Sequence, residues 1–267
     1  MVTATATRPV GDLLRDWRRR RRLSQLELSN EAGISTRHLS FLETGRARPS
    51  RDMVLRLTER LDVPLRDRNG LLMAAGFAPV YRERSIDSPE MRPARQALNR
   101  VLDGHEPYPA IVVDRVWNLV MANEAAMLFL EGAPEDLVRS PINIHRLALH
   151  PRGLAARAVN LQEVRSHLVA RMARQVALTG DPDLTALHEE TRAYGGGDDD
   201  GPHEPSHDIA LPTRLRYDDQ VLAFFSTVTT FGTAEDVTLA ELAIEAFFPA
   251  DDETAAFLRR RAESRRD

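Results

Sequence analysis

The stretch that decides the fold of the N-terminal region is Leu23-Ser24-Gln25-Leu26-Glu27-Leu28-Ser29, followed after three residues by Gly33-Ile34-Ser35. Ser24 and Glu27 have the spacing of a capping box, in which the serine accepts from a backbone amide and the glutamate reaches back. Gly33 suits the positive φ that ends a helix, and Ser35 suits the start of the next one. The stretch therefore predicts two short helices joined by a tight turn.

Similar residues that start and end helices occur on both sides of this stretch, and they predict five short helices between residues 10 and 79. An apolar stripe over residues 13–17 marks the first helix. Gly45 closes the third helix, Pro49 opens the fourth, and Pro64 precedes the fifth. Two short helices around a glycine turn form a helix-turn-helix, whose second helix can enter the major groove of DNA.

Several separate positions in this region match one known family. The matching stretches resemble the phage-repressor-like (xenobiotic-response-element, XRE) helix-turn-helix family, and they are Leu23–Ser29, Gly33-Ile34-Ser35, Leu39–Arg46 and Pro49-Ser50. The resemblance implies an all-α DNA-binding domain over residues 8–80. Its partner would be double-stranded operator DNA.

The resemblance also implies roles for individual residues. Thr36 and Arg37 match positions that face base edges, and arginine suits a bidentate contact with guanine. Phe41 matches a groove-facing position, or it packs at a domain or dimer interface. Arg18 and Glu43 match a partly buried ion pair that joins the first and third helices. The residues implied to contact DNA are Gln25, Ser35, Thr36, Arg37, His38, Ser40, Phe41, Arg46 and Arg48.

Charge is divided unevenly along the 267 residues. Residues 1–84 carry 17 Arg and 10 acidic residues, whereas residues 85–267 carry 19 Arg and 30 acidic residues. This asymmetry favours a basic module for a polyanion joined to an acidic module that does something else. The two modules are expected to be joined by a linker with a connecting helix over residues 81–106.

Two residue types are absent from the chain, and their absence excludes whole classes of enzyme. Without Cys or Lys there is no thiolate nucleophile, Cys-ligated metal, P-loop lysine or Ser–Lys dyad. His203-Glu204-Pro205-Ser206-His207 satisfies a zinc-peptidase motif, but Pro205 would break the helix which that motif requires. We therefore expect no enzyme, no catalytic residue and no metal. No apolar run spans a bilayer and no signal peptide is evident, so a cytoplasmic, nucleoid-associated protein is expected.

The chain changes character from Pro107 onward. Ala110–Val113 and Asn118–Ala122 predict short strands, and Asn123–Leu130 predicts a helix. Two strands followed by this helix resemble the opening of a PAS domain. The expected architecture is an α+β PAS-like domain with an antiparallel sheet over residues 107–265.

The rest of this module adds further helices and strands. A long amphipathic helix, a mobile loop and two strands are predicted, in that order, at Leu161–Val176, Tyr194–Asp208, Ile209–Tyr217 and Leu222–Phe231. Thr238 and Glu241 have capping-box spacing, which predicts a helix that also carries Ile244 and Phe247-Phe248. A final helix with an Asp cap and an Arg-rich end closes the chain.

The order of the two modules resembles that of the MmyB-like transcription regulators. The stretches that carry this resemblance are Pro109–Asn118, Asn123–Ala126 and Phe225–Gly232. It implies that the second module binds a small apolar molecule, with a fatty acid or similar lipid as the leading suggestion and no other cofactor. The residues predicted to contact this ligand are Trp117, Met121, Phe224, Ser226, Val228 and Thr229.

Two functions for the second module remain open at this stage. The first is a sensor whose ligand alters DNA binding. The second is a dimerisation or protein-interaction module without a ligand. A pocket around the Phe-rich strand would favour the sensor, and a filled core there would favour the interaction module. In either case a homodimer is expected, because one recognition helix reads only a few base pairs.

Overall fold

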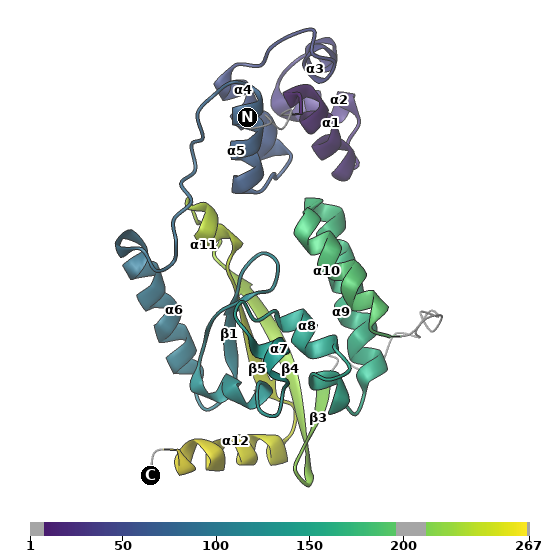
Figure 1. Ribbon diagram of the computed structural model, residues 1–267. Coiled ribbons are helices and arrows are strands. Elements are labelled where there is room, and N and C mark those ends of the chain that lie inside the picture. Colours follow the sequence, from purple (N-terminus) through teal and green to yellow (C-terminus); the bar gives the residue numbers. More distant parts are fainter. Residues whose placement is uncertain (1–7, 196–211, 266–267) are drawn as a thin grey trace, which may run out of the picture. The chain divides into compact units, whose positions relative to one another are not determined.

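A computed structural model describes residues 8–195 and 212–265 (Figure 1). The chain divides into two compact units. The first unit contains the residues up to Arg84, with the short pieces 177–179 and 234–240, and the second unit contains the rest. Within the described ranges, no helix has the length and apolar character needed to cross a bilayer.

The first unit consists mainly of the five short helices that the sequence predicts. Ser24 accepts a hydrogen bond from the Glu27 amide at 3.1 Å, and the Glu27 carboxylate accepts one from the Ser24 amide at 2.7 Å. Gly33 ends the second helix with a φ of 65°, and Ser35 caps the third. The helices are α1 (Val10–Arg20), α2 (Gln25–Ala32), α3 (Thr36–Glu43), α4 (Arg51–Arg60) and α5 (Leu65–Ala74).

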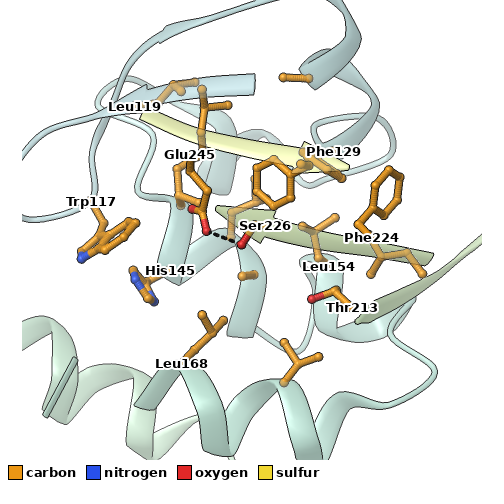
Figure 2. A pocket seen from close by; sticks show the side chains of 18 of the residues that line it. Trp117, Leu119, Phe129, His145, Leu154, Leu168, Thr213, Phe224, Ser226 and Glu245 are labelled. Atoms are coloured by element: carbon orange, nitrogen blue, oxygen red, sulfur yellow. Dashed lines mark hydrogen bonds between the residues drawn. The ribbon is translucent and has the colours of Figure 1, made fainter. Parts of the chain in front are cut away.

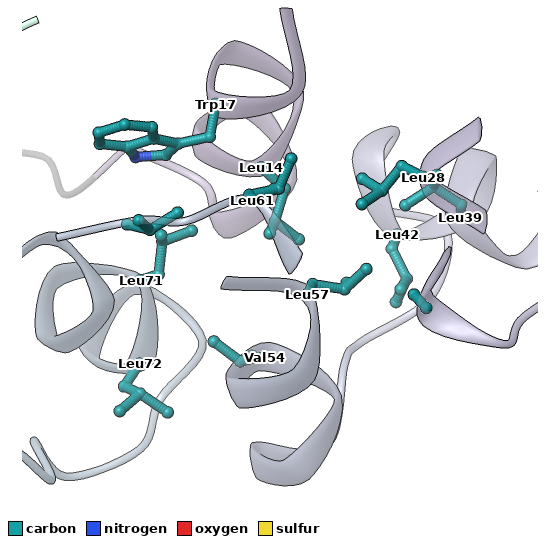
Figure 3. Close-up of a cluster of buried hydrophobic side chains, with 12 residues drawn as sticks. Leu14, Trp17, Leu28, Leu39, Leu42, Val54, Leu57, Leu61, Leu71 and Leu72 are labelled. Atoms are coloured by element: carbon teal, nitrogen blue, oxygen red, sulfur yellow. The ribbon is translucent and has the colours of Figure 1, made fainter. Parts of the chain in front are cut away.

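Leucine side chains from all five helices fill the centre of this unit (Figure 3). The fully buried ones include Leu14, Leu28, Leu39, Leu42, Leu57, Leu71 and Leu72. Burying each leucine stabilises the fold by about 1.5–3 kcal/mol relative to leaving it exposed. Helix α1 approaches the end of α3 so closely that a Cβ atom at Gly11 would lie 2.4 Å from the Leu42 carbonyl oxygen.

The second unit is built around a five-stranded sheet with the order β2-β1-β5-β4-β3. Every neighbouring pair of strands is antiparallel. The strands are β1 (Ala110–Val113), β2 (Leu119–Ala122), β3 (Thr213–Tyr217), β4 (Gln220–Thr230) and β5 (Ala243–Pro249). An all-α helix-turn-helix domain followed by an α+β PAS-like domain is thus confirmed.

Helices surround this sheet. Helix α6 (Arg92–His105) packs against β1, and α12 (Asp252–Ser264) packs against β4 and β5. The other helical segments of this unit are η1 (Pro89–Met91), η2 (Glu124–Phe129), α7 (Glu135–Val138), α8 (Ile144–Leu149), η3 (Leu154–Ala156), α9 (Leu161–Thr179, except its last residues) and α10 (Pro182–Ala193). Helix α11 (Val237–Glu241) lies almost wholly in the piece 234–240 that belongs to the first unit. The connecting helix, the long helix and the final helix appear where the sequence predicts them.

The structure corrects the predicted helix that carries Ile244 and Phe247-Phe248. These residues lie in β5, between β1 and β4, and only the short helix α11 precedes them. The capping residue of α11 is Asp236, whose carboxylate accepts from the Thr238 amide at 3.0 Å. A central strand gains hydrogen bonds on both sides, and this outweighs the local helix signal.

Other predicted segments differ only in part. The segment after Asn123 is helical, but it is a 3₁₀ rather than an α-helix. The start of the predicted strand at Ile209 and Leu211 lies outside the described residues. Residues 196–208 of the predicted loop, including the zinc-peptidase-like segment, also lie outside them.

Candidate functional site

The exposed side of α3 is the first candidate site. Thr36, Arg37, Ser40 and Phe41 share one side of the helix, because residues three or four apart are neighbours on its surface. The guanidinium carbon of Arg37 lies 5.3 Å from the centre of the Phe41 ring, and that of Arg46 lies 5.9 Å from it. Two exposed cations therefore flank one half-buried aromatic ring.

Other residues implied to contact DNA hold the start of α3 in place. The Ser35 hydroxyl accepts from the His38 amide at 3.1 Å. The Ser29 hydroxyl donates to a carbonyl of its own helix, so the Thr36 hydroxyl donates to Ser29, at 2.9 Å. The first contact caps α3, and the second ties α3 to α2. Of the remaining implied residues, Ser40 is half-buried and Arg48 is exposed.

A buried network joins α1, α2 and α3. Glu43 is 2% exposed and accepts from Arg18 Nε at 2.6 Å and Nη2 at 2.8 Å. Gln25 Nε2 donates to the same carboxylate at 2.8 Å. Burial by itself would raise the pKa of Glu43, but the hydrogen bonds from Arg18 and Gln25 outweigh it and lower that pKa. The network fixes the angle at which α3 is presented.

The second candidate site is a cavity of about 260 Å³ in the second unit (Figure 2). It lies between the sheet and the helical segments η2, α8 and α9. Most of the side chains around it are apolar, and they include Ile111, Leu119, Phe129, Ile144, Leu147, Leu154, Leu168 and Phe247. A concave apolar space with a few polar groups is the usual form of a small-molecule site.

Three of the six predicted ligand residues line this cavity, namely Trp117, Phe224 and Ser226. The other three lie outside the lining. Met121 pairs with Val112, whereas the next pair, Ala122 and Ile111, lines the cavity, so Met121 lies on the opposite face of the sheet. Val228 is 43% exposed on β4, and Thr229 is exposed on the other side of that strand.

The register of β4 and β5 brings a charged group to the cavity. Ser226 pairs with Phe247, and Glu245 lies two residues before Phe247 on the same face. Glu245 is 6% exposed. Its carboxylate accepts from the Ser226 hydroxyl at 2.9 Å and from Arg171 Nη1 of α9 at 3.4 Å.

Trp117 connects this polar group to the opposite wall. The guanidinium carbon of Arg171 lies 4.2 Å from the centre of the indole ring. The indole nitrogen donates to Gln175 at 2.9 Å. The ring of His145 meets the indole edge-to-face, with 4.5 Å between ring centres. The tryptophan is therefore held on three sides while it lines the cavity.

His145 is a buried polar group without a full set of partners. It is 3% exposed, and its Nδ1 atom has no hydrogen-bond partner among the described residues. Burial, with the charge of Arg171, lowers the pKa of His145 to about 3. Burial and the charges of Arg171 and Arg174 also lower the pKa of His167, which lines the same cavity. Both imidazoles favour the neutral form.

Comparison with protein families finds one matching model over each of the two regions. A model of the MmyB-like transcription regulator ligand binding domain matches residues 94–260. The chain belongs to the MmyB-like transcription regulators. A helix-turn-helix domain model matches residues 9–71. The MmyB-like protein thus combines a DNA-binding helix-turn-helix domain with a ligand-binding domain, and the cavity lies within the matched range of the latter.

Two solved structures share limited similarity with this MmyB-like chain. One is the clp gene regulator ClgR from Corynebacterium glutamicum, with 26% identity, 37% of this chain and 90% of that chain covered, and a TM-score of 0.22. The other is an RNA-binding light-oxygen-voltage receptor, with 16% identity, 98% and 64% covered, and a TM-score of 0.25. With TM-scores this low, neither similarity bears on function. No curated protein sequence matches the chain.

Sequence reasoning missed the polar side of the MmyB-like cavity. Arg171 lies within the long helix α9 and His145 within the short helix α8, and no local sequence signal marks either as a cavity residue. Glu245 offered one signal, because it is the single charged residue in the apolar stretch Ala243–Pro249. The run of arginines at the end of α1 has a structural role that its charge does not reveal. Arg21 donates to the carbonyl oxygens of Leu61 and Asp62, at 2.7 and 2.6 Å, and so caps α4.

Proposed function

We propose that this protein is a sequence-specific transcriptional regulator whose affinity for its operator depends on a small apolar molecule held in the second unit. The observation that carries the proposal is the cavity of about 260 Å³. Ligand sites commonly measure about 300–1,000 Å³, so this volume suits a compact or medium-length ligand. A fatty acid, the ligand suggested by the family resemblance, is one candidate.

The cavity favours the sensor over a ligand-free interaction module. An interaction module has no need of an internal space, and its core is more stable when it is filled. Here the Phe-rich strand β4 contributes Phe224 and Ser226 to the wall of an open space. Native mass spectrometry of the purified full chain should therefore detect a co-purified small molecule.

A cavity-filling substitution tests the sensor directly. Leu168 points into the cavity from α9, and Leu168→Trp should occupy the space that the ligand needs. The matched control is Val221→Trp, on β4 where the side chain is 47% exposed. A ligand at about 100 times its Kd should stabilise the wild-type fold by about 2.7 kcal/mol. We expect this stabilisation to disappear in Leu168→Trp and to persist in Val221→Trp.

DNA recognition by α3 is tested by two arginines that flank the same ring. Arg37→Ala should relax base preference at one operator position and cost about 1–3 kcal/mol there. Arg46→Ala should weaken binding to all sequences alike and reduce its salt dependence, as expected for a phosphate contact. Binding to an operator library at several salt concentrations distinguishes the two. If Arg37→Ala left base preference intact, α3 would not be the reading helix.

A homodimer on an inverted repeat completes the proposal. Paired helix-turn-helix units read half-sites about 10 base pairs apart, or a multiple of that spacing. Sedimentation of the protein–DNA complex should give two chains per operator. Footprinting should show two protected half-sites. A single chain bound to one half-site would contradict this part of the proposal.

A further inference from the structure

The polar side of the cavity is electrically balanced. The titratable side chains that line it in the described part of the chain are His145, His167, Arg171 and Glu245. Arg171 and Glu245 carry opposite charges and contact each other at 3.4 Å. The two histidines lie in surroundings that favour their neutral forms. The wall therefore holds one positive and one negative charge, already paired.

On the basis of the proposed function, we infer that the cavity selects a ligand whose polar end is uncharged. The ligand class is an apolar body that ends in an amide or hydroxyl group, which can donate a hydrogen bond. This assignment differs from a fatty acid in one respect, which is the charge at the polar end.

A carboxylate would meet an unfavourable environment in this space. It would lie beside Glu245, whose side chain is only 8% exposed, and Arg171 is already shared with that glutamate. Burying a charge is costly unless a partner of opposite sign is available, and like charges at close range repel. No further cation lines the cavity among the described residues.

An uncharged polar group finds suitable partners in the same place. The Ser226 hydroxyl donates to Glu245, and its oxygen retains lone pairs that can accept a hydrogen bond from the ligand. Because the hydrogen of this hydroxyl is used by Glu245, the ligand group that fits beside it is one that donates, such as an amide or a hydroxyl. An uncharged group of this kind needs no partner of opposite charge, whereas an ionised group in the same place would.

The test compares decanamide with decanoate, two probes of the same length and nearly the same shape that differ in charge. Calorimetric titration of the full chain at about pH 7, where the carboxylate is ionised, measures both affinities. We expect decanamide to bind about tenfold more tightly than decanoate, or better, as a charge-balanced wall requires.

Two variants show whether charge balance causes the preference. Glu245→Gln leaves Arg171 unpaired, so decanoate should gain about tenfold in affinity while decanamide changes little. Arg171→Gln leaves Glu245 unpaired, so decanoate should lose affinity further. Glu253→Gln removes the same charge from an exposed position on α12 and should change neither affinity. Decanamide binding and the thermal midpoint report whether each variant is folded.

The outcomes separate this inference from the proposed function. Equal or tighter binding of decanoate by the wild type would overturn the inference and leave the sensor in place. A preference for decanamide that Glu245→Gln does not alter would also overturn it, because apolarity and not charge balance would then be the cause. Failure of both probes and of all co-purified molecules to bind would overturn the proposed function and the inference together.

Discussion

The two units of this protein each bury an arginine–glutamate pair, but the surroundings of the two pairs differ. Glu43 accepts three hydrogen bonds from Arg18 and Gln25, none longer than 2.8 Å, in a core filled with leucine. Glu245 accepts from Ser226 at 2.9 Å and from Arg171 at only 3.4 Å, and it borders a cavity. The first arrangement fully uses its polar groups to hold three helices. The second leaves hydrogen-bonding capacity beside an open space, which is what a binding site requires.

The largest effect on stability should come from breaking the Arg18–Glu43 pair of the first unit. Glu43→Ala leaves Arg18 and Gln25 without their shared acceptor, which should lower the free energy of unfolding of the first unit by about 3–5 kcal/mol. Urea denaturation of the full chain, followed by Trp17 fluorescence in a Trp117→Phe background, measures this. Glu59→Ala, at an exposed position on α4, should change stability by less than about 0.5 kcal/mol. Equal losses of stability in Glu43→Ala and Glu59→Ala would show that the buried hydrogen bonds of Glu43 contribute little to the stability of the first unit.

A smaller effect should come from the close approach of α1 and α3. Gly11→Ala places a Cβ atom 2.4 Å from a backbone oxygen that cannot move freely, and should lower stability by about 1–3 kcal/mol. Gly70→Ala is the matched control, because a Cβ atom there meets nothing within 4 Å. Alanine favours helix over glycine by up to about 1 kcal/mol, so this control should be neutral or stabilising. The same urea measurement compares the two, and a stable Gly11→Ala would show that the two helices can separate at little cost.

The smallest effect should come from His145, the buried histidine that lines the cavity of the second unit. Because the pKa of His145 falls from 6.5 to about 3 on folding, the unfolded chain binds a proton below pH 6.5 that the folded chain does not. The stability of the second unit should be complete above pH 6.5 and should decrease as the pH falls. The slope should approach about 1.4 kcal/mol per pH unit.

His145→Phe tests this pH dependence. The variant should flatten the stability profile between pH 6.5 and 5.5, and His167 and His188 should account for any slope that remains because their pKa values are also lowered. Trp117 fluorescence in a Trp17→Phe background follows the second unit. His38→Phe, in the first unit, should leave the slope unchanged. An unaltered slope in His145→Phe would show that this imidazole is accessible to protons in the folded state.

The first unit was largely predictable from the sequence because its signals are local. The capping box at Ser24 and Glu27 and the helix end at Gly33 each depend on residues within a few positions. The strand β5 was not predictable in this way. The spacing of Thr238 and Glu241 correctly indicated a turn of helix, but the next residues along the chain pair with β1 and β4, which come from distant parts of the sequence.

The cavity also contains both residues that the sequence predicted and residues that it did not. On β4 the sequence selected Phe224, Ser226, Val228 and Thr229, and only the first two line the cavity, because alternation does not show where along a strand the cavity ends. Met121 on β2 also lies outside the lining, because the irregular register between β1 and β2 decides which residues of β2 face the cavity. Arg171 and Glu245 are 74 residues apart, and no local pattern connects them.

The sequence by itself determined the five N-terminal helices, the presence of a helix-turn-helix and the existence of an α+β second domain. Each of these depends on short-range capping, turn and periodicity signals. Only the tertiary structure decided that Gly11 must lack a side chain, that β5 is a strand, and that Arg171, Glu245 and His145 share one cavity. The reason is physical, since such contacts depend on strand register and helix packing between segments that are far apart along the chain.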